Sequence, residues 1–489
     1  MQQLTGVDAS FLYMESGTTF GHVSSLIVYD PKGTEGGGFE ATKAMFRERL
    51  HLLDPMRRKL VEVPFNLDHP YWIEDPDLDL DFHIRETAVP PPGNREQVAE
   101  LVSRLIARPL DRSRPLWELY VINGLEGGRI AQLTKIHHAA IDGVGGAQLL
   151  GNILDIEPDA PPRDPGDLPE PEPVPTQEQM LLRGLTALAT QPYKQGRIVV
   201  RTLQELPQIG RAVDWAGMAK RLPQPVAQLL GQGARRVEDE PPPVSRTGGL
   251  TVPSTRFNNK IGPHRRFAYT DVALADVKAV KSALGVTVND VVLGMCAGAL
   301  RAYLDKKGEL PAESLRCMIP VSVRTENQAN TFGNQVSGML AALATDVEDP
   351  VARLEVIHQE TQRAKESLGA LPADLLTEVA DFPPPAIAAR ASRVMARTTL
   401  ANRVAPPFNV IISNVPGPQF PLYAGGAEML TYIPVSAVAD TQGLNITIMS
   451  YNGRCDFGLV ACRDAVPDLW DLCNLLEDAL EELKDVAGV

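Results

Sequence analysis

One stretch in the first third of the chain joins a histidine pair to a glycine-rich turn: Lys135-Ile-His137-His138-Ala-Ala-Ile-Asp142-Gly143-Val-Gly145-Gly146. The residues that lead into it, 129–137, are strand-like, and Val144–Asp155 after it has the apolar spacing of a helix. Because successive side chains of a strand point to opposite faces, only one of the two histidines can face a given cavity. The pattern favours one working imidazole with a supporting neighbour and argues against two ligands converging on one metal ion.

Histidine is the usual general base at neutral pH, and accepting a proton from an alcohol typically accelerates a reaction by about 10²–10⁴-fold. That factor corresponds to roughly 3–5.5 kcal/mol of the barrier. Asp142 follows four residues after His138, where it can orient the base or brace the loop through an arginine. Gly143 can let the backbone approach a ligand closely.

The segments around this stretch alternate between strand and helix patterns. Upstream, Trp117–Ile122 and residues 129–137 are separated by Gly124–Gly128, which predicts a hairpin. The second half predicts helices at Asp271–Leu284, Val288–Lys306, Asp349–Leu368 and Leu469–Val486, and strands at Leu315–Val323, Phe408–Ser413, Leu444–Tyr451 and Cys455–Cys462. This alternation favours an α/β fold with mixed sheets.

The length of 489 residues predicts two domains, since a single core rarely exceeds roughly 250–300 residues. Residues 155–175 hold eight prolines and seven acidic residues against one arginine, a composition typical of an extended linker. A second proline-rich loop surrounds residues 241–243. We therefore expect an N-terminal domain at 1–154, a connector at 155–250 and a C-terminal domain at 251–489.

The net charge of −14 argues against a nucleic-acid partner, because phosphate binding needs a basic face. The connector differs: residues 177–236 carry nine Lys/Arg against three acids, with apolar spacing that suggests short amphipathic helices. Such a segment can lie on an anionic membrane or droplet surface, or it can be a solvated connector. The most apolar stretch, Val291–Leu300, is about half of the ~20 residues that a membrane span needs, and Met1–Ser16 lacks a signal-peptide pattern.

The five cysteines are odd in number and contain no C-x-x-C pair, so we expect reduced thiols in a cytosolic protein and no zinc site. The chain also lacks a G-x-S-x-G serine elbow, and none of its cysteines sits in a recognisable catalytic motif. The sequence therefore shows no motif for a covalent serine or cysteine intermediate.

The run His137-His138-Ala-Ala-Ile-Asp142-Gly143 resembles the H-H-x-x-x-D-G motif of the bacterial wax ester synthase/diacylglycerol acyltransferase family, which is related to chloramphenicol acetyltransferase and to peptide-synthetase condensation domains. The resemblance covers nearly the whole chain. Other segments similar to that family are Leu4–Tyr13, Val61–Pro64, Trp72–Pro76, Pro115–Glu118, Thr287–Asp290, Pro320–Arg324 and Ser413–Pro418.

The resemblance implies two chloramphenicol acetyltransferase-like domains with mixed sheets, joined by a long helical connector. It also implies transfer of a long-chain acyl group from acyl-coenzyme A, a co-substrate, to diacylglycerol, to a long-chain alcohol, or to both, with no further cofactor. By this resemblance His138 is the general base, His137 supports it, and Asp142 with Gly143 shapes the loop. Such a protein would be cytoplasmic and peripherally associated with the inner membrane or with lipid droplets.

Four further places in the sequence carry open interpretations. Thr287 and Asp290 form the pattern of a capping box, which puts Asn289 at the positive end of a helix. Asn289 there is suited to bind an oxyanion or a coenzyme A phosphate. Both Asn289 and Asp290 could equally be capping residues. Pro115, Leu116 and Trp117 read as core packing, or as the lining of a substrate channel. Arg324 is a candidate partner for Asp142 or a plain surface arginine. Placing Asn414 beside the active-site channel rests on the resemblance.

Two alternative functions stay open at this point. Condensation domains share the histidine motif, so amide- or ester-forming transfer on carrier proteins is one alternative, although no carrier or adenylation module is visible in the chain. A lipid-binding homologue that has lost activity is the other, and the intact His137, His138, Asp142 and Gly143 argue against it.

Overall fold

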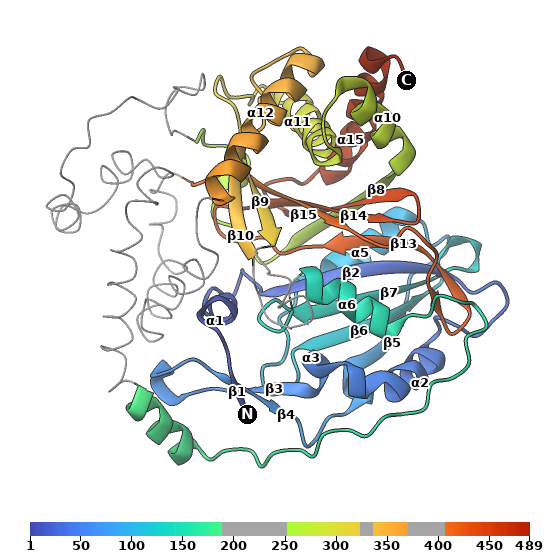
Figure 1. The fold of residues 1–489 in the computed structure, drawn as a ribbon, viewed down its shortest axis with the longest axis vertical. Helices are drawn as coiled ribbons and strands as arrows, with labels where there is room; N and C mark the ends of the chain where they lie inside the picture. Colours follow the sequence, from blue (N-terminus) through green and yellow to red (C-terminus); the bar gives the residue numbers. More distant parts are fainter. Residues whose placement is uncertain (142, 188–251, 323–335, 370–405) are drawn as a thin grey trace, which may run out of the picture.

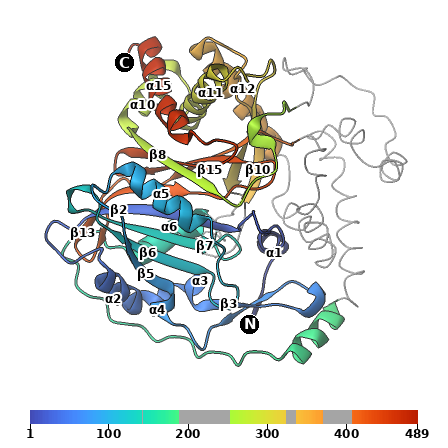
Figure 2. The ribbon, with the colours of Figure 1, turned by 180° about the vertical axis from the view of Figure 1, so that it is seen from behind.

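The computed structural model describes residues 1–489 except 142, 188–251, 323–335 and 370–405, and it contains two six-stranded sheets flanked by helices (Figures 1 and 2). Each sheet combines parallel and antiparallel neighbours. This confirms the prediction of an α/β fold with mixed sheets.

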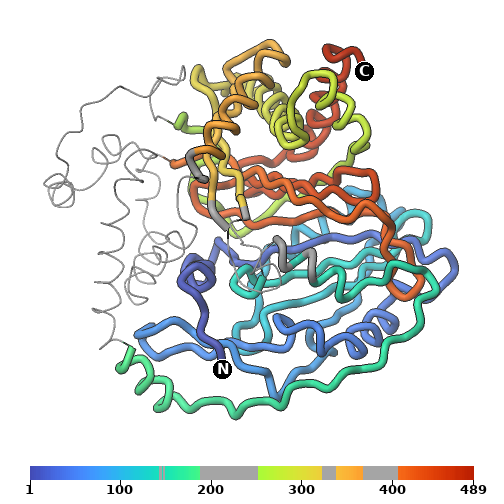
Figure 3. Tube along the Cα trace, viewed as in Figure 1, coloured from blue at the N-terminus to red at the C-terminus, as the bar shows by residue number. Residues whose placement is uncertain are grey.

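The first sheet has the order β12-β13-β2-β7-β6-β5. Its strands are β12 (Tyr423–Ala424), β13 (Ala427–Val435), β2 (His22–Asp30), β7 (Ile130–His137), β6 (Trp117–Asn123) and β5 (Ile84–Ala88). The first two come from the far end of the chain, so an orange strand lies directly beside the blue strand β2 in Figure 3. The sheet that carries the histidine motif is therefore completed by residues after 420.

The second sheet has the order β10-β9-β11-β14-β15-β8. Its strands are β10 (Val336–Ala342), β9 (Arg316–Ser322), β11 (Val410–Pro416), β14 (Leu444–Tyr451), β15 (Arg454–Cys462) and β8 (Arg265–Ala273). A small sheet of β1 (Gln2–Gln3), β4 (Tyr71–Glu74) and β3 (Arg58–Val61) lies at the N-terminal end of the molecule.

Helices cover the outer faces of both sheets. The second sheet is covered by α10 (Leu274–Leu284), α11 (Val288–Lys306), α12 (Pro350–Gly369) and α15 (Leu469–Ala487), which share one apolar core with its strands. The first sheet packs its outer face on α2 (Phe39–Arg49), α3 (Asp54–Arg57) and α6 (Gly143–Ile153). Other helices are α1 (Gly6–Tyr13), α4 (Leu80–His83) and α5 (Arg95–Ile106).

The inner faces of the two sheets meet in a shared core, which we call the seam. On β6, Trp117 points to the outer helices, whereas Tyr120 and Ile122 point into the seam together with α5 and Phe267 of β8. Both strands are buried along most of their length, which suits the mostly apolar sequence of β6. On β7, Leu133 lies in the seam, so His137, which has the same parity, emerges on the seam side.

Most predicted elements lie where the sequence placed them, and α11 and β14 have the predicted bounds. The predicted start of the helix at Asp271 was wrong, because residues 271–273 end β8 and α10 begins at Leu274. The physical reason is strand pairing, since Asp271 lies opposite Asp456 in the ladder between β8 and β15. Residues 160–176 have no regular structure, and 177–187 are helical. The rest of the basic segment lies outside the described residues.

Candidate active site

The histidine pair is held at the end of β7, between two neighbouring strands. The His137 amide donates to the carbonyl of Leu116, at 2.9 Å, and the His138 amide donates to the carbonyl of Gly21, at 2.8 Å. The chain then turns, since the Ala140 amide donates to the carbonyl of His137, at 2.9 Å. The backbone at the motif is thus fixed from both sides.

The two imidazoles have different surroundings, as strand alternation predicts. His137 is buried, with 1% of its surface exposed, whereas His138 is partly exposed. The His138 ring stacks on Phe11 of α1, with ring centroids 4.2 Å apart and planes within 1° of parallel. Phe11 thus gives the more accessible imidazole a fixed apolar platform.

His137 has a different neighbour at each ring nitrogen. Its Nδ1 accepts a hydrogen bond from the Ala139 amide, at 3.0 Å. Its Nε2 lies 3.2 Å from Oε1 of Glu15, an ion-pair distance at which the bond angle is not that of a regular hydrogen bond. Glu15 is therefore an acidic partner of His137.

Glu15 is itself enclosed by donors. Its Oε1 accepts from the Gly21 amide, at 2.8 Å, and its Oε2 accepts from Nε and Nη2 of Arg112, at 3.0 and 2.6 Å. Burial raises the pKa of Glu15, but His137, the Gly21 amide and Arg112 outweigh it and hold the pKa at about 2. Glu15 is thus a carboxylate at every pH at which the protein would work.

The sequence reasoning missed Glu15 and Arg112. Glu15 follows the quoted segment Leu4–Tyr13 by two residues, and its only local signal is one acid after an apolar run. Of the predicted loop residues, Asp142 and Arg324 lie outside the described residues, so their predicted pairing stays a prediction. Gly143 is the first residue of α6, which follows the histidine turn in the sequence.

Leu116 and Trp117 are core residues, each about 1% exposed, and Pro115 before them is also buried. The Trp117 indole Nε1–H donates to the carbonyl of Met56, at 2.8 Å, and its ring stacks on His83 at a centroid distance of 4.4 Å. The backbone of this segment also serves the histidine motif, because Leu116 accepts the His137 amide.

In the second half, the predicted capping box is confirmed: the Asp290 amide donates to Thr287 Oγ1, and Asp290 Oδ2 accepts from the Thr287 amide. Asp290 is fully buried and also bonds His358 Nδ1, at 2.7 Å, and Thr361 Oγ1, at 2.8 Å, both on α12. Burial raises the pKa of Asp290, but His358, Thr287 and Thr361 lower it below its ordinary value. The carboxylate therefore braces α11 against α12.

Asn289 and Asn414 are brought together although 125 residues separate them, since Asn414 Nδ2 donates to Asn289 Oδ1 at 3.5 Å. Both side chains are partly exposed. Asn414 lies on β11 and Asn289 in the first turn of α11, so the two amides meet where that strand passes the N-terminus of the helix.

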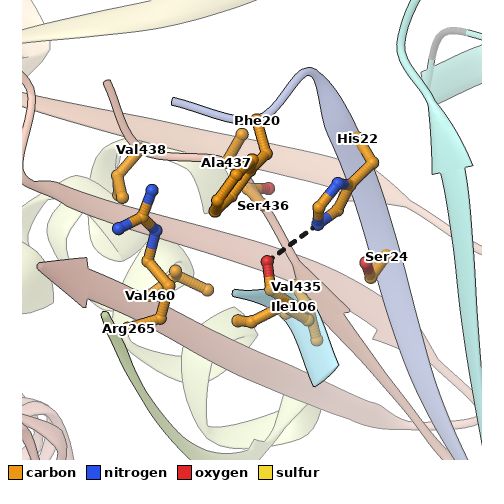
Figure 4. Close-up of a pocket in the computed structure, with 10 residues that line it drawn as sticks. All are labelled: Phe20, His22, Ser24, Ile106, Arg265, Val435, Ser436, Ala437, Val438 and Val460. Carbon is orange, nitrogen blue, oxygen red and sulfur yellow. Dashed lines mark hydrogen bonds between the residues drawn. The ribbon is translucent and has the colours of Figure 1, made fainter. Parts of the chain in front are cut away.

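Two hollows lie near the motif. A cavity of about 10 Å³ at the seam is lined by His22, Ser24 and Arg265 among others (Figure 4), and it is at the lower limit for one water molecule. A larger cleft, about 440 Å³, lies between α1 and the loop that joins β3 to β4. Glu15 and Arg112 form part of its wall, and only the larger hollow has the volume of a ligand site.

Among the described residues, no group of three His, Cys, Asp or Glu side chains could hold a metal ion. All five cysteines are buried and unpaired, and burial raises the pKa of Cys317 to about 12 and that of Cys455 to about 11. The Cys317 and Cys455 thiols are therefore not poised as nucleophiles.

Within the described part of the chain, no helix alone is long and apolar enough to cross a membrane. The pair α10 and α11, bent by 101° between them, passes that test of length and composition together.

Residues 4–292 match the family model described as the wax ester synthase/diacylglycerol acyltransferase catalytic domain, and residues 332–484 match the WS/DGAT C-terminal domain. The chain is 38% identical over 493 residues to a Mycobacterium tuberculosis protein named "Probable diacyglycerol O-acyltransferase tgs2", with 99% of this chain and 98% of that one covered.

Two solved structures resemble the fold. The wax ester synthase/diacylglycerol acyltransferase from Marinobacter aquaeolei VT8 matches with a TM-score of 0.69 at 29% identity, over 100% of both chains. A starter condensation domain of rhizomide synthetase RzmA matches with a TM-score of 0.53 at 12% identity, over 100% of this chain and 94% of that one. The second similarity shows the fold alone.

Proposed function

The chain belongs to the wax ester synthase/diacylglycerol acyltransferase family, and from this premise we propose that it makes triacylglycerol by acylating diacylglycerol from long-chain acyl-coenzyme A, with His138 as the general base. The observation that carries the proposal is the complete H-H-x-x-x-D-G run at the end of β7, inside the matched catalytic domain. Fatty alcohols are proposed as second acceptors, which would yield wax esters.

The proposed reaction is a direct transfer. His138 takes the proton of the acceptor hydroxyl while its oxygen bonds to the thioester carbonyl carbon, which forms a tetrahedral oxyanion. The carbon–sulfur bond then breaks, and the imidazolium returns the proton to the coenzyme A thiolate. The mechanism needs no cofactor beyond the acyl-coenzyme A co-substrate, and it leaves His138 as it began.

The surroundings of the two histidines support this division of roles. A general base needs access to the hydroxyl, and His138 is the partly exposed imidazole, whereas His137 is buried and has a neighbour at each ring nitrogen. We propose that Asp142 and Gly143 shape the loop between the turn and α6, with Arg324 as the partner of Asp142.

For Asn289 and Asn414 we propose a role in handling acyl-coenzyme A. The support is their contact at 3.5 Å, which presents two amide side chains together at the positive end of α11. Amide groups at a helix N-terminus suit an oxyanion or a phosphate. Asp290 would act indirectly, by fixing the first turn of α11 that carries Asn289.

We further propose that the enzyme works from the cytoplasm at the surface of the inner membrane or of lipid droplets. Diacylglycerol is apolar and resides in such phases, and the basic segment 177–236 can bind an anionic surface. Replacing Arg197, Arg201 and Arg211 with Gln should reduce co-sedimentation with anionic liposomes. Unchanged binding would favour a solvated connector.

The function is tested with purified protein, labelled palmitoyl-coenzyme A and either dioleoylglycerol or hexadecanol, with neutral lipids resolved by thin-layer chromatography. Labelled triacylglycerol is expected with the first acceptor and wax ester with the second. An absence of product with both acceptors would overturn the proposed activity, and product with only one would fix the acceptor class.

A further inference from the structure

We infer that Glu15, clamped by Arg112, positions His137 and, through it, the turn that carries His138. The inference rests on the proposed role of His138 as base and adds two positioning residues to it. Its support is a continuous set of contacts that joins Arg112, Glu15, His137 and the Ala139 amide.

The first step concerns the tautomer of His137. The Ala139 amide donates to Nδ1, at 3.0 Å, so Nδ1 must offer a lone pair and the ring proton sits on Nε2. Nε2 lies 3.2 Å from Glu15 Oε1. Because the angle is not that of a regular hydrogen bond, the negative charge of Glu15, rather than a directed bond, favours this tautomer.

The second step concerns how rigidly the carboxylate is held. Arg112 donates to Oε2 through Nε and Nη2, and its Nη2 also donates to the carbonyl of Leu12, at 2.7 Å, at the end of α1. The carboxylate is therefore fixed relative to the helix whose Phe11 supports the His138 ring. The contact between Arg112 and Glu15 thus sets the surroundings of both His137 and His138.

Gly21 connects the same parts through its backbone. Its amide donates to Glu15 Oε1, at 2.8 Å, while its carbonyl accepts the His138 amide, also at 2.8 Å. A Cβ at this position would lie 2.5 Å from His137 Nε2, so only glycine lets the strand pass this close to the imidazole. The position of Glu15 and the backbone of His138 are thus set by one residue.

Losing the charge at Glu15 would let His137 adopt the other tautomer, which breaks the Ala139 bond and loosens the turn. We expect Glu15→Gln to lower kcat by about 10- to 100-fold, the scale of one charge-assisted contact, while KM for both substrates stays within about twofold. Glu15→Asp should retain more activity than Glu15→Gln, although Gln matches Glu in size. This order separates charge from packing.

Glu100 supplies the control. It is an exposed carboxylate that also pairs with an arginine, Arg104, but it lies on α5 and does not line the cleft. Glu100→Gln should therefore leave kcat within about twofold of the wild type. Urea unfolding of each variant checks that the proteins are folded. If Glu15→Gln does not fold, Arg112→Gln tests the Arg112–Glu15 contact instead, because Arg112 is more exposed than Glu15.

The outcomes separate this inference from the proposed function. If His138→Ala is inactive but Glu15→Gln and Arg112→Gln keep the wild-type kcat, the positioning role is overturned and the base assignment stands. If His138→Ala is active, the base assignment itself fails. A folded Glu15→Gln with low kcat, unchanged KM and partial recovery in Glu15→Asp is the result that supports the inference.

Discussion

A buried carboxylate where the two sheets meet should make the stability of the protein fall between pH 4 and 7. Asp456 of β15 is fully buried, and its Oδ2 accepts from the Tyr432 amide of β13, at 2.8 Å. Within the described residues its Oδ1 has no hydrogen-bond partner, and Nε of Arg454 lies 4.0 Å from it. Burial and the neighbouring Asp271 raise the pKa of Asp456 to about 7.

The direction and the magnitude of the change in stability with pH follow from this pKa shift. A carboxyl group whose pKa is higher in the folded protein than in the unfolded chain stabilises the fold fully below the unfolded value, near 3.8, and loses that contribution as the pH rises through 7. About three pKa units at roughly 1.4 kcal/mol each give at most about 4 kcal/mol. Asp456→Asn removes the titration, so it should be more stable than the wild type at pH 8.

The assay is urea unfolding followed by tryptophan fluorescence at pH 5, 6, 7 and 8 for the wild type and for Asp456→Asn. The stability advantage of the variant should widen by roughly 2–3 kcal/mol between pH 5 and pH 8. Asp464→Asn, at a largely exposed carboxylate, should show no such trend. Parallel pH profiles for the wild type and Asp456→Asn would refute the reasoning.

Two further changes test the scaffold around the motif. Trp117→Phe removes the donor to the Met56 carbonyl and should lower the free energy of unfolding by about 1–3 kcal/mol, with kcat unchanged. If the variant and the wild type are equally stable in urea, the role assigned to that bond is contradicted. His358→Ala removes one of the two bonds that join Asp290 to α12 and should also cost about 1–3 kcal/mol, whereas His358→Gln, which keeps a donor, should recover part of the loss.

The elements that could be predicted from sequence are those with a local signal. The helix α11 begins at a capping box and keeps an apolar face for five turns, so both of its ends are encoded within its own residues. The hairpin of β6 and β7 is likewise set by its glycine-rich connection. The histidine motif was visible because several of its residues are adjacent in the chain.

The rest depends on residues that are distant in sequence. Nothing near β13 indicates that it pairs with β2, about 400 residues earlier, and the ladder between β8 and β15 overrides the helix-start signal at Asp271. The contact of Asn289 with Asn414 and that of Glu15 with Arg112 arise only after the chain folds. Single charged residues of this kind carry no periodicity from which a partner could be predicted.

The central claim is that His138 is the general base of acyl transfer, and the rate of His138→Ala tests it most directly. Its turnover with palmitoyl-coenzyme A and dioleoylglycerol should fall by about 10²–10⁴-fold at saturating substrates, while its urea midpoint stays near that of the wild type. A folded His138→Ala protein that makes triacylglycerol within about tenfold of the wild-type rate would contradict the account.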